Sequence, residues 1–210
     1  MVKTKDHPED QAPPPAFSEE LYEWLKNGGD QTLIGLNRLF GEKTFAIAFL
    51  LLMALPALPL PTGGLTHITE IITMLLSLEL IAGRRTVWLP RRWRQVDVGK
   101  MLRGRAVGRL IAFIAWFERL SRRRWSSLLT RRPVLSAVGL VILLFTVAAF
   151  VAPPFSGLDT LPALGVVIMS LALILEDGLI LLAGIIIGIA GIGLEITAGA
   201  ALYDGLKHWL

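Results

Sequence analysis

The sequence contains no cysteine and only three histidines. Without cysteine there is no disulfide framework and no metal or redox site that needs a thiolate. No two of His7, His67 and His208 stand at metal-ligand spacing. A glycine-rich phosphate loop before a helix is also missing, and no nucleophile has an evident base. We therefore expect no enzymatic activity, no metal and no cofactor.

Charge is missing from the most apolar parts of the chain. The stretches 137–151 and 179–194 carry no charged side chain, while 53% of all residues are hydrophobic. A soluble helix of that length would interleave polar residues at helical spacing. The composition predicts an all-α integral membrane protein, made of two repeated helical hairpins and a C-terminal transmembrane helix over 178–210.

Five apolar blocks define the membrane part. They are 44–60, 65–82, 134–152, 158–175 and 178 to about 203. Only the last block comfortably exceeds the about 20 residues that a straight span needs. The first meets Pro56 and Pro59 early. It is therefore expected to end as a helix before it has crossed a bilayer.

The N-terminal part looks polar and interfacial. Residues 1–16 have the proline-rich composition of a disordered tail, and the first 43 residues lack the apolar core of a cleaved signal peptide. Two amphipathic interfacial helices are predicted within 17–43. Ser18 is expected to cap the first of them, and Gly28 and Gly29 to end it.

The segment 84–133 is strongly basic. It holds 15 of the 21 Lys and Arg residues but only two acids, Asp97 and Glu118. An interfacial helix is predicted over 106–120. Two runs mix arginine with tryptophan, and their arginines are expected to face lipid: Arg91, Arg92, Arg94, Arg122, Arg123 and Arg124. We predict anionic lipid headgroups rather than nucleic acid as the partner, and a cytoplasmic position for this segment.

An internal repeat relates the hairpins at 44–83 and 134–177. An offset of 93 residues superposes Pro61 on Pro154, Gly64 on Gly157 and Ser77 on Ser170. The repeated bends are formed by six residues: Pro59, Pro61, Gly64, Pro153, Pro154 and Gly157. Each unit is either a hairpin of two spans or a re-entrant hairpin, and the short first block favours re-entry. Such repeats are typical of transporters, with the units either parallel or inverted.

Polar residues are concentrated in the block 65–82. A candidate intramembrane polar site consists of His67, Glu70, Thr73 and Ser77. Thr66 shares a helical stripe with the last three, and we expect this stripe to face protein or water. Glu70 and His67 either handle a proton or cation, or Glu70 is hydrated near a helix end or paired with an arginine.

Other charged residues have simpler expected roles. Glu79 is expected to pair with Arg84, and Asp159 to cap the helix that follows it. Glu176 and Asp177 are candidates for ion pairs with the basic segment. Glu195 is either near the far interface or a second intramembrane acid.

The C-terminal block contains a Gly-x-x-x-Gly motif formed by Gly184 and Gly188. Such a motif permits close approach of two helix backbones. We favour helix packing within the chain over a homodimer contact, which remains a possible second use of the motif.

The pattern of prolines, glycines and tryptophans resembles the ExoD family of bacterial exopolysaccharide-synthesis proteins. The resemblance covers about residue 18 to the C-terminus and depends on four segments: 55–64, 78–85, 88–93 and 153–157, with the step 176–178 in addition. Members often have a small polar residue near the first turn, where this chain has Ala57.

The resemblance implies a multi-pass protein of the bacterial inner membrane that supports exopolysaccharide synthesis or export. With the repeat, it favours a transporter-like function. The alternative is a scaffold that does not transport and that recruits anionic lipid or polysaccharide-assembly partners through the basic segment.

Overall fold

The computed structural model describes residues 16–26, 32, 35, 43–58, 65–84, 105–121, 125–153 and 156–207. Every element assigned within these residues is an α-helix, as predicted. The helices are α1 (Phe17–Lys26), α3 (Thr44–Met53), α4 (Leu65–Ile81), α6 (Arg105–Leu120), α7 (Ser126–Leu129), α8 (Arg132–Val151), α9 (Thr160–Leu175) and α10 (Gly178–Lys207).

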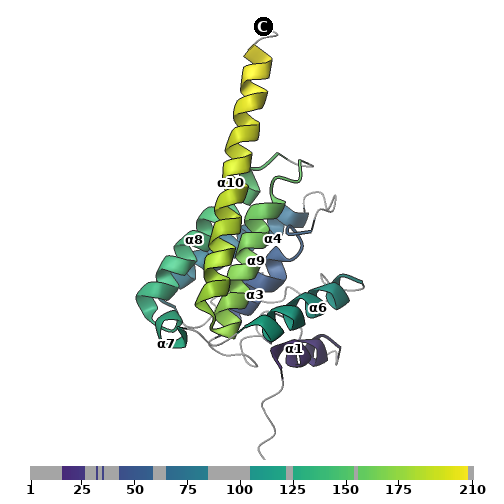
Figure 1. The fold of residues 1–210 in the computed structure, drawn as a ribbon, viewed down its shortest axis with the longest axis vertical. Helices are drawn as coiled ribbons and strands as arrows, with labels where there is room; N and C mark the ends of the chain where they lie inside the picture. The colour runs from purple at the N-terminus through teal and green to yellow at the C-terminus, as the bar shows by residue number, and fades with distance from the viewer. Residues whose placement is uncertain are drawn as a thin grey trace, which may run out of the picture.

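Two antiparallel hairpins, α3 with α4 and α8 with α9, form the centre of the molecule (Figure 1). They contact each other crosswise, because α3 packs against α9 and α4 packs against α8. The Lys43 Nζ at the start of α3 lies 3.1 Å from the carbonyl oxygen of Ile174 near the end of α9. Likewise, the Ser136 hydroxyl near the start of α8 donates to the Ile81 carbonyl at 3.1 Å. Both hairpins therefore begin at the same end of the bundle.

Helix α3, the first helix of the first hairpin, is the most deeply buried element. All ten residues of α3 are buried, and most of α9 is buried beside it. As predicted, α3 is short: it ends at Met53, because Pro56 has no N–H to donate to the Leu52 carbonyl. At about 1.5 Å per residue it spans about 15 Å.

The helices α4 and α9 end in the same way. Gly83 follows α4 with φ = 74°, and Glu176 follows α9 with φ = 56°. The Arg84 amide donates to the Glu79 carbonyl at 3.1 Å, and the Asp177 amide donates to the Ala172 carbonyl at 3.0 Å. These bonds are those of a Schellman motif, in which a left-handed residue ends the helix.

Glycines bring α9 and α10 into close contact. A Cβ on Gly165 would lie 2.8 Å from the Gly188 Cα and 3.0 Å from the Gly184 carbonyl oxygen. The predicted Gly-x-x-x-Gly motif therefore faces α9 of the same chain. In Figure 1, α10 runs along the bundle and extends well past it at the C-terminal end.

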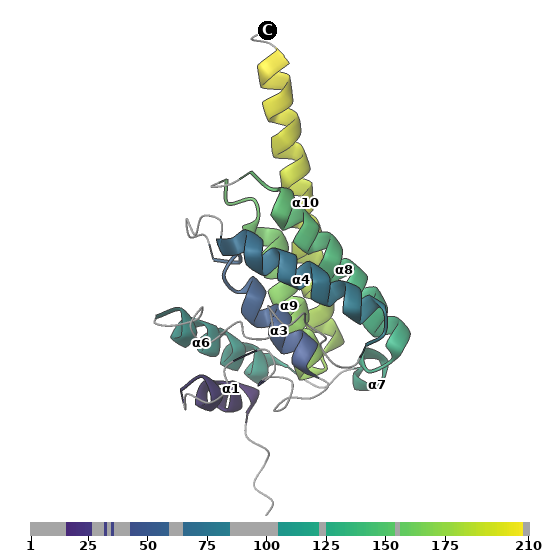
Figure 2. The ribbon, with the colours of Figure 1, turned by 180° about the vertical axis from the view of Figure 1, so that it is seen from behind.

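A peripheral layer of α1 and α6 lies at the end of the bundle where the hairpins begin (Figures 1 and 2). The two helices are joined through Glu118, whose carboxylate accepts hydrogen bonds from the Ser18 amide, at 3.1 Å, and from the Ser18 hydroxyl. The prediction that Ser18 caps α1 is wrong, since the helix already includes Phe17 and the Ser18 side chain binds α6. Helix α6 coincides with the helix predicted over 106–120.

Within the described residues, two helices have the length and apolar composition of a membrane span. They are α8 and the part of α10 from Gly178 to Ala201. Large apolar side chains are exposed along α8 and α10, among them Leu140, Leu144, Ile186 and Ile189. Exposed apolar surface of this extent indicates contact with lipid or with another protein.

Several predicted features lie outside the described residues. They are the tail before residue 16, the turn residues Pro59, Pro61, Gly64 and Pro154, and all six lipid-facing arginines. Of the second turn, Pro153 is exposed, and Gly157 has φ = 70°, a left-handed conformation that glycine adopts without strain.

Candidate functional site

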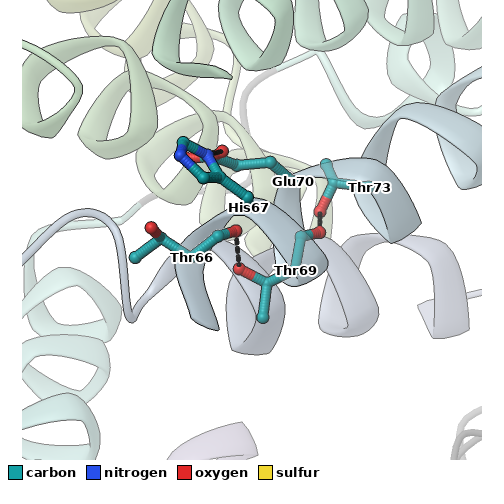
Figure 3. Close-up of polar contacts among 5 residues, drawn as sticks. All are labelled: Thr66, His67, Thr69, Glu70 and Thr73. Carbon is teal, nitrogen blue, oxygen red and sulfur yellow. Dashed lines mark hydrogen bonds and ion pairs between the residues drawn. The ribbon is translucent and has the colours of Figure 1, made fainter. Parts of the chain in front are cut away.

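Glu70 is the central residue of the candidate site. It lies in the second turn of α4 and is 0% exposed. Its Oε2 is 2.9 Å from the Nδ1 of His67, one turn earlier on the same helix (Figure 3). His67 is the more accessible partner, because 38% of its side chain is exposed. The pair therefore joins a buried acid to a side chain that reaches the surface.

Among the described residues, Glu70 is paired with His67 and not with an arginine. Its partner is His67, and its second carboxylate oxygen, Oε1, is buried without a hydrogen-bond partner. A buried carboxylate oxygen without a partner costs free energy, because it has lost its water and gained nothing in exchange. A buried oxygen of this kind is expected where a bound proton or another ligand supplies the missing interaction.

The hydroxyl groups near Glu70 are occupied by their own helix. The Thr69 hydroxyl donates to the Thr66 carbonyl at 2.8 Å, and the Thr73 hydroxyl donates to the Thr69 carbonyl at 2.8 Å (Figure 3). The Ser77 hydroxyl donates to the Thr73 carbonyl at 2.7 Å. All four side chains are buried, so the polar stripe faces protein, as expected. The predicted site members Thr73 and Ser77 thus lie on the same face as Glu70 but do not bind it.

The opposite face of α4 is apolar and exposed. It carries Ile68, Ile71, Leu75 and Leu78. The buried face of α4 thus mixes Glu70 and the hydroxyl residues with Ile72, Leu76 and Leu80, whereas its exposed face is apolar. A helix on a water-soluble domain instead exposes a polar face.

Residues from two other parts of the chain lie near the pair. The ring of Phe150, near the end of α8, packs edge-on against His67 with 5.1 Å between the ring centroids. Asp159, before α9, interacts as a like charge with Glu70 and also with Glu195 of α10. Glu195 resembles Glu70, because its Oε1 is also buried without a hydrogen-bond partner.

Asp159 does not cap α9, contrary to our prediction. It is the residue before the helix, but its side chain makes no capping hydrogen bond. Sequence reasoning also missed that Asp159 lies close enough to interact with both Glu70 and Glu195. No local pattern links these residues, because their proximity depends on tertiary packing. Within the described part of the chain, no group of three acidic or histidine side chains could hold a metal ion.

The remaining acids lie at the other end of the bundle. Glu176 lies 3.8 Å from the Nζ of Lys43, and Asp177 accepts hydrogen bonds from the Ser121 hydroxyl and the Leu179 amide. Lys43 precedes the first hairpin and does not belong to the basic segment. The pairing of Glu79 with Arg84 stays a prediction.

Comparison with known proteins agrees with the resemblance seen in the sequence. The model of the family "Exopolysaccharide synthesis, ExoD" matches residues 17–197. An uncharacterized protein of Synechocystis sp. is 29% identical over 209 residues, which cover 92% of this chain and 95% of the relative. No solved structure matches the chain. The protein is thus a member of the ExoD family, which implies a role in exopolysaccharide synthesis.

Proposed function

We propose that this protein is a multi-pass inner-membrane protein that moves protons or cations in support of exopolysaccharide synthesis or export. The observation that carries the proposal is Glu70, a fully buried carboxylate with one oxygen unpartnered and the other bound to His67. An ionisable residue inside a membrane protein is costly and is typically retained for a proton or ion pathway.

The reversed polarity of α4 supports the membrane part of the proposal. Its exposed side is made of large apolar residues, whereas its buried side holds Glu70 and four hydroxyl side chains. Exposure of the apolar side is unfavourable in water but favourable in lipid. The two helices long enough to span, α8 and α10, also expose apolar side chains.

The crosswise packing supports a duplicated hairpin. The offset of 93 residues makes α3 equivalent to α8 and α4 equivalent to α9. Under that equivalence the contact of α3 with α9 corresponds to the contact of α4 with α8, and both occur. Because both hairpins begin at the same end, the repeats are parallel, and the axis that relates them runs along the bundle.

Both hairpins are proposed to reach the far side of the membrane rather than to re-enter. The start of α4 lies at the end of α8, where His67 contacts Phe150. Helix α8 has 20 residues and, at about 1.5 Å per residue, matches the about 30 Å of the hydrocarbon core. The start of α4 therefore lies as deep as the end of a full span.

The chemistry of the site suits proton transfer. His67 is accessible enough to exchange a proton with the surroundings and is hydrogen-bonded to Glu70. Asp159 and Glu195 continue the line of acids toward α10. A proton on one of these groups reduces their mutual repulsion, so successive protonation gives a route along the site.

Proton flux in proteoliposomes tests this proposal. The full chain is reconstituted with a pH-sensitive dye inside the vesicles, and an acid-outside gradient is applied. We expect acidification that is at least about tenfold slower in Glu70→Gln, which cannot exchange the proton. Glu79→Gln is the control, because it removes a half-buried acid from the same helix without touching the His67–Glu70 pair.

The same variants are then assayed in cells. In an exopolysaccharide-deficient strain lacking this protein, the wild type and Glu79→Gln should restore polymer production, and Glu70→Gln should not. Full restoration by Glu70→Gln, together with an absence of proton and cation flux for the wild type, would remove the transport function.

A scaffold role is the second candidate function. The observation that favours it is the peripheral helix α6, where Trp116 is 58% exposed while Ile114 and Phe117 on the same helix are buried. An exposed tryptophan beside basic residues is typical of a membrane interface or of a partner-binding face. If this role is correct, replacing Arg122, Arg123 and Arg124 by glutamine abolishes binding to anionic vesicles, whereas unchanged binding contradicts it.

A further inference from the structure

A cavity lies at the end of the bundle opposite the Glu70 site. Its volume is about 180 Å³, and it is formed where α3 and α8 begin and α4 and α9 end. Glu70 and Leu80 are ten residues apart on α4, which corresponds to about 15 Å along the helix. The cavity is therefore separate from the candidate proton site.

The inner wall of the cavity is apolar. It is formed by Phe45 and Ala46 of α3, Leu80 of α4, Leu135 of α8 and Leu173 of α9. Phe45, Ala46 and Leu80 are themselves buried in the core. The wall can therefore accept hydrocarbon but offers no hydrogen bonds to a polar ligand.

The rim of the cavity is cationic. Lys43, Arg84 and Arg132 line it, and Glu176 is the one acid among its lining residues. Lys43 is already placed against Glu176 and the Ile174 carbonyl. Lys43 is thus partly neutralised, whereas Arg132 is exposed at the rim. Helices α3 and α8 begin at this cavity while α4 and α9 end there, so the opposite ends of the helix dipoles offset one another, and the positive field comes from the side chains.

Equivalent residues of the two hairpins meet in this cavity. With the offset of 93 residues, Leu80 corresponds to Leu173, and Gly83 corresponds to Glu176; all four line it. The cavity thus lies close to the axis proposed to relate the repeats. Arg84 and Arg132 do not correspond to each other under this offset. The cationic rim is therefore not part of the repeat.

We propose that this cavity binds the phosphate group of an anionic membrane lipid, with the first methylene groups of its chain against the apolar wall. Arginine is suited to phosphate because its guanidinium donates two parallel hydrogen bonds to phosphate oxygens. The combination of an apolar wall and a cationic rim recognises an alkyl phosphate better than a free phosphate ion. The proposal rests on the membrane location proposed above but not on proton movement.

Native mass spectrometry of the purified full chain in a neutral detergent tests the proposal. Phosphatidylglycerol and phosphatidylcholine are titrated separately, and dodecyl phosphate and inorganic phosphate serve as competitors. We expect preferential retention of phosphatidylglycerol, its displacement by dodecyl phosphate, and no displacement by inorganic phosphate at the same concentration. Displacement by inorganic phosphate would identify a free-phosphate site and overturn the assignment to lipid.

Arg132→Gln is the decisive variant, and Arg131→Gln is its matched control. Both arginines are exposed and adjacent, but only Arg132 lines the cavity. We expect Arg132→Gln to weaken phosphatidylglycerol binding about tenfold or more and Arg131→Gln to leave it unchanged. Equal effects of the two variants would mean general surface attraction and would overturn the site.

A second variant protects the test against misfolding. Arg132→Lys keeps the charge but loses the paired donors, and we expect intermediate affinity with an unchanged melting temperature. Lipid binding is measured without an ion gradient, so the two proposals can fail separately. If Glu70→Gln loses proton flux but still binds lipid, the lipid site is supported. If Arg132→Gln loses lipid binding but keeps normal flux, the transport proposal is unaffected.

Discussion

Gly83 and Glu176 stand 93 positions apart and end α4 and α9 in the same left-handed conformation. Each is followed by an amide that donates to the carbonyl five residues earlier. One of the two positions holds the residue best suited to this conformation, and the other holds a residue with a Cβ. The shared geometry therefore comes from the packing of the two helix ends and not from a shared residue type.

The cap after α4 should depend on glycine. A Cβ at Gly83 would meet no atom within 4 Å, so Gly83→Ala tests conformation alone. We expect it to lower the free energy of unfolding by about 1 kcal/mol, because alanine adopts this backbone conformation with strain. Thermal unfolding in detergent measures the effect. Gly108→Ala is the control: Gly108 lies inside α6 with open space around it, and its replacement should be neutral or slightly stabilising.

The contact between α9 and α10 should not tolerate a larger residue. In Gly165→Ala the new methyl group would lie 2.8 Å from the Gly188 Cα, and neither backbone can move away without separating the helices. We expect a loss of about 1–3 kcal/mol in stability. Gly193→Ala on α10 places its methyl group in open space and should leave stability unchanged. A Gly165→Ala protein as stable as the wild type would contradict the close packing.

Loss of His67, the hydrogen-bond partner of Glu70, should destabilise the protein because it leaves a buried carboxylate without a partner. His67→Phe keeps an aromatic ring against Phe150 but leaves both oxygens of Glu70 without a hydrogen bond. We expect a loss of about 1–3 kcal/mol in stability. The double variant His67→Phe with Glu70→Leu removes the buried polar group and should recover most of the loss. A double variant as unstable as the single one would show that the carboxylate is not the cause.

The lack of cysteine allows the topology to be mapped with single substitutions. Thr130→Cys and Ser156→Cys lie on either side of α8 and are exposed. A membrane-impermeant maleimide should label them from opposite faces, with Thr130→Cys on the cytoplasmic face. Leu75→Cys, on the exposed apolar stripe of α4, should be labelled from neither face. Labelling of Leu75→Cys by the aqueous reagent would place that stripe in water.

The helix positions could be predicted from the sequence, because apolar blocks and their ends are local features. Residues 158–175 were expected to form one block, and α9 runs from Thr160 to Leu175. The early end of α3 followed from Pro56. The conformation of Glu176 could not be predicted, since a glutamate in the left-handed region is imposed by its surroundings.

The candidate site could be predicted only in part. His67 and Glu70 are one helical turn apart, so their contact was within reach of sequence reasoning. The proximity of Asp159 and Glu195 was not, because it depends on how three helices pack. The same holds for Ser18, whose hydrogen-bond partner lies 100 residues away on α6. The spacing of residues along the chain does not reveal which distant residue a polar side chain will bind.

The short, fully buried helix α3 has a consequence for how the protein is made. Its ten residues are fewer than the about 20 that insertion as an independent span requires. Its neighbour α9 begins more than 100 residues later in the chain, so it leaves the ribosome long after α3. Stable insertion of the first hairpin must therefore wait for the second. A nascent chain halted after α8 is expected to leave α3 without its partner and to become a substrate for membrane quality-control proteases.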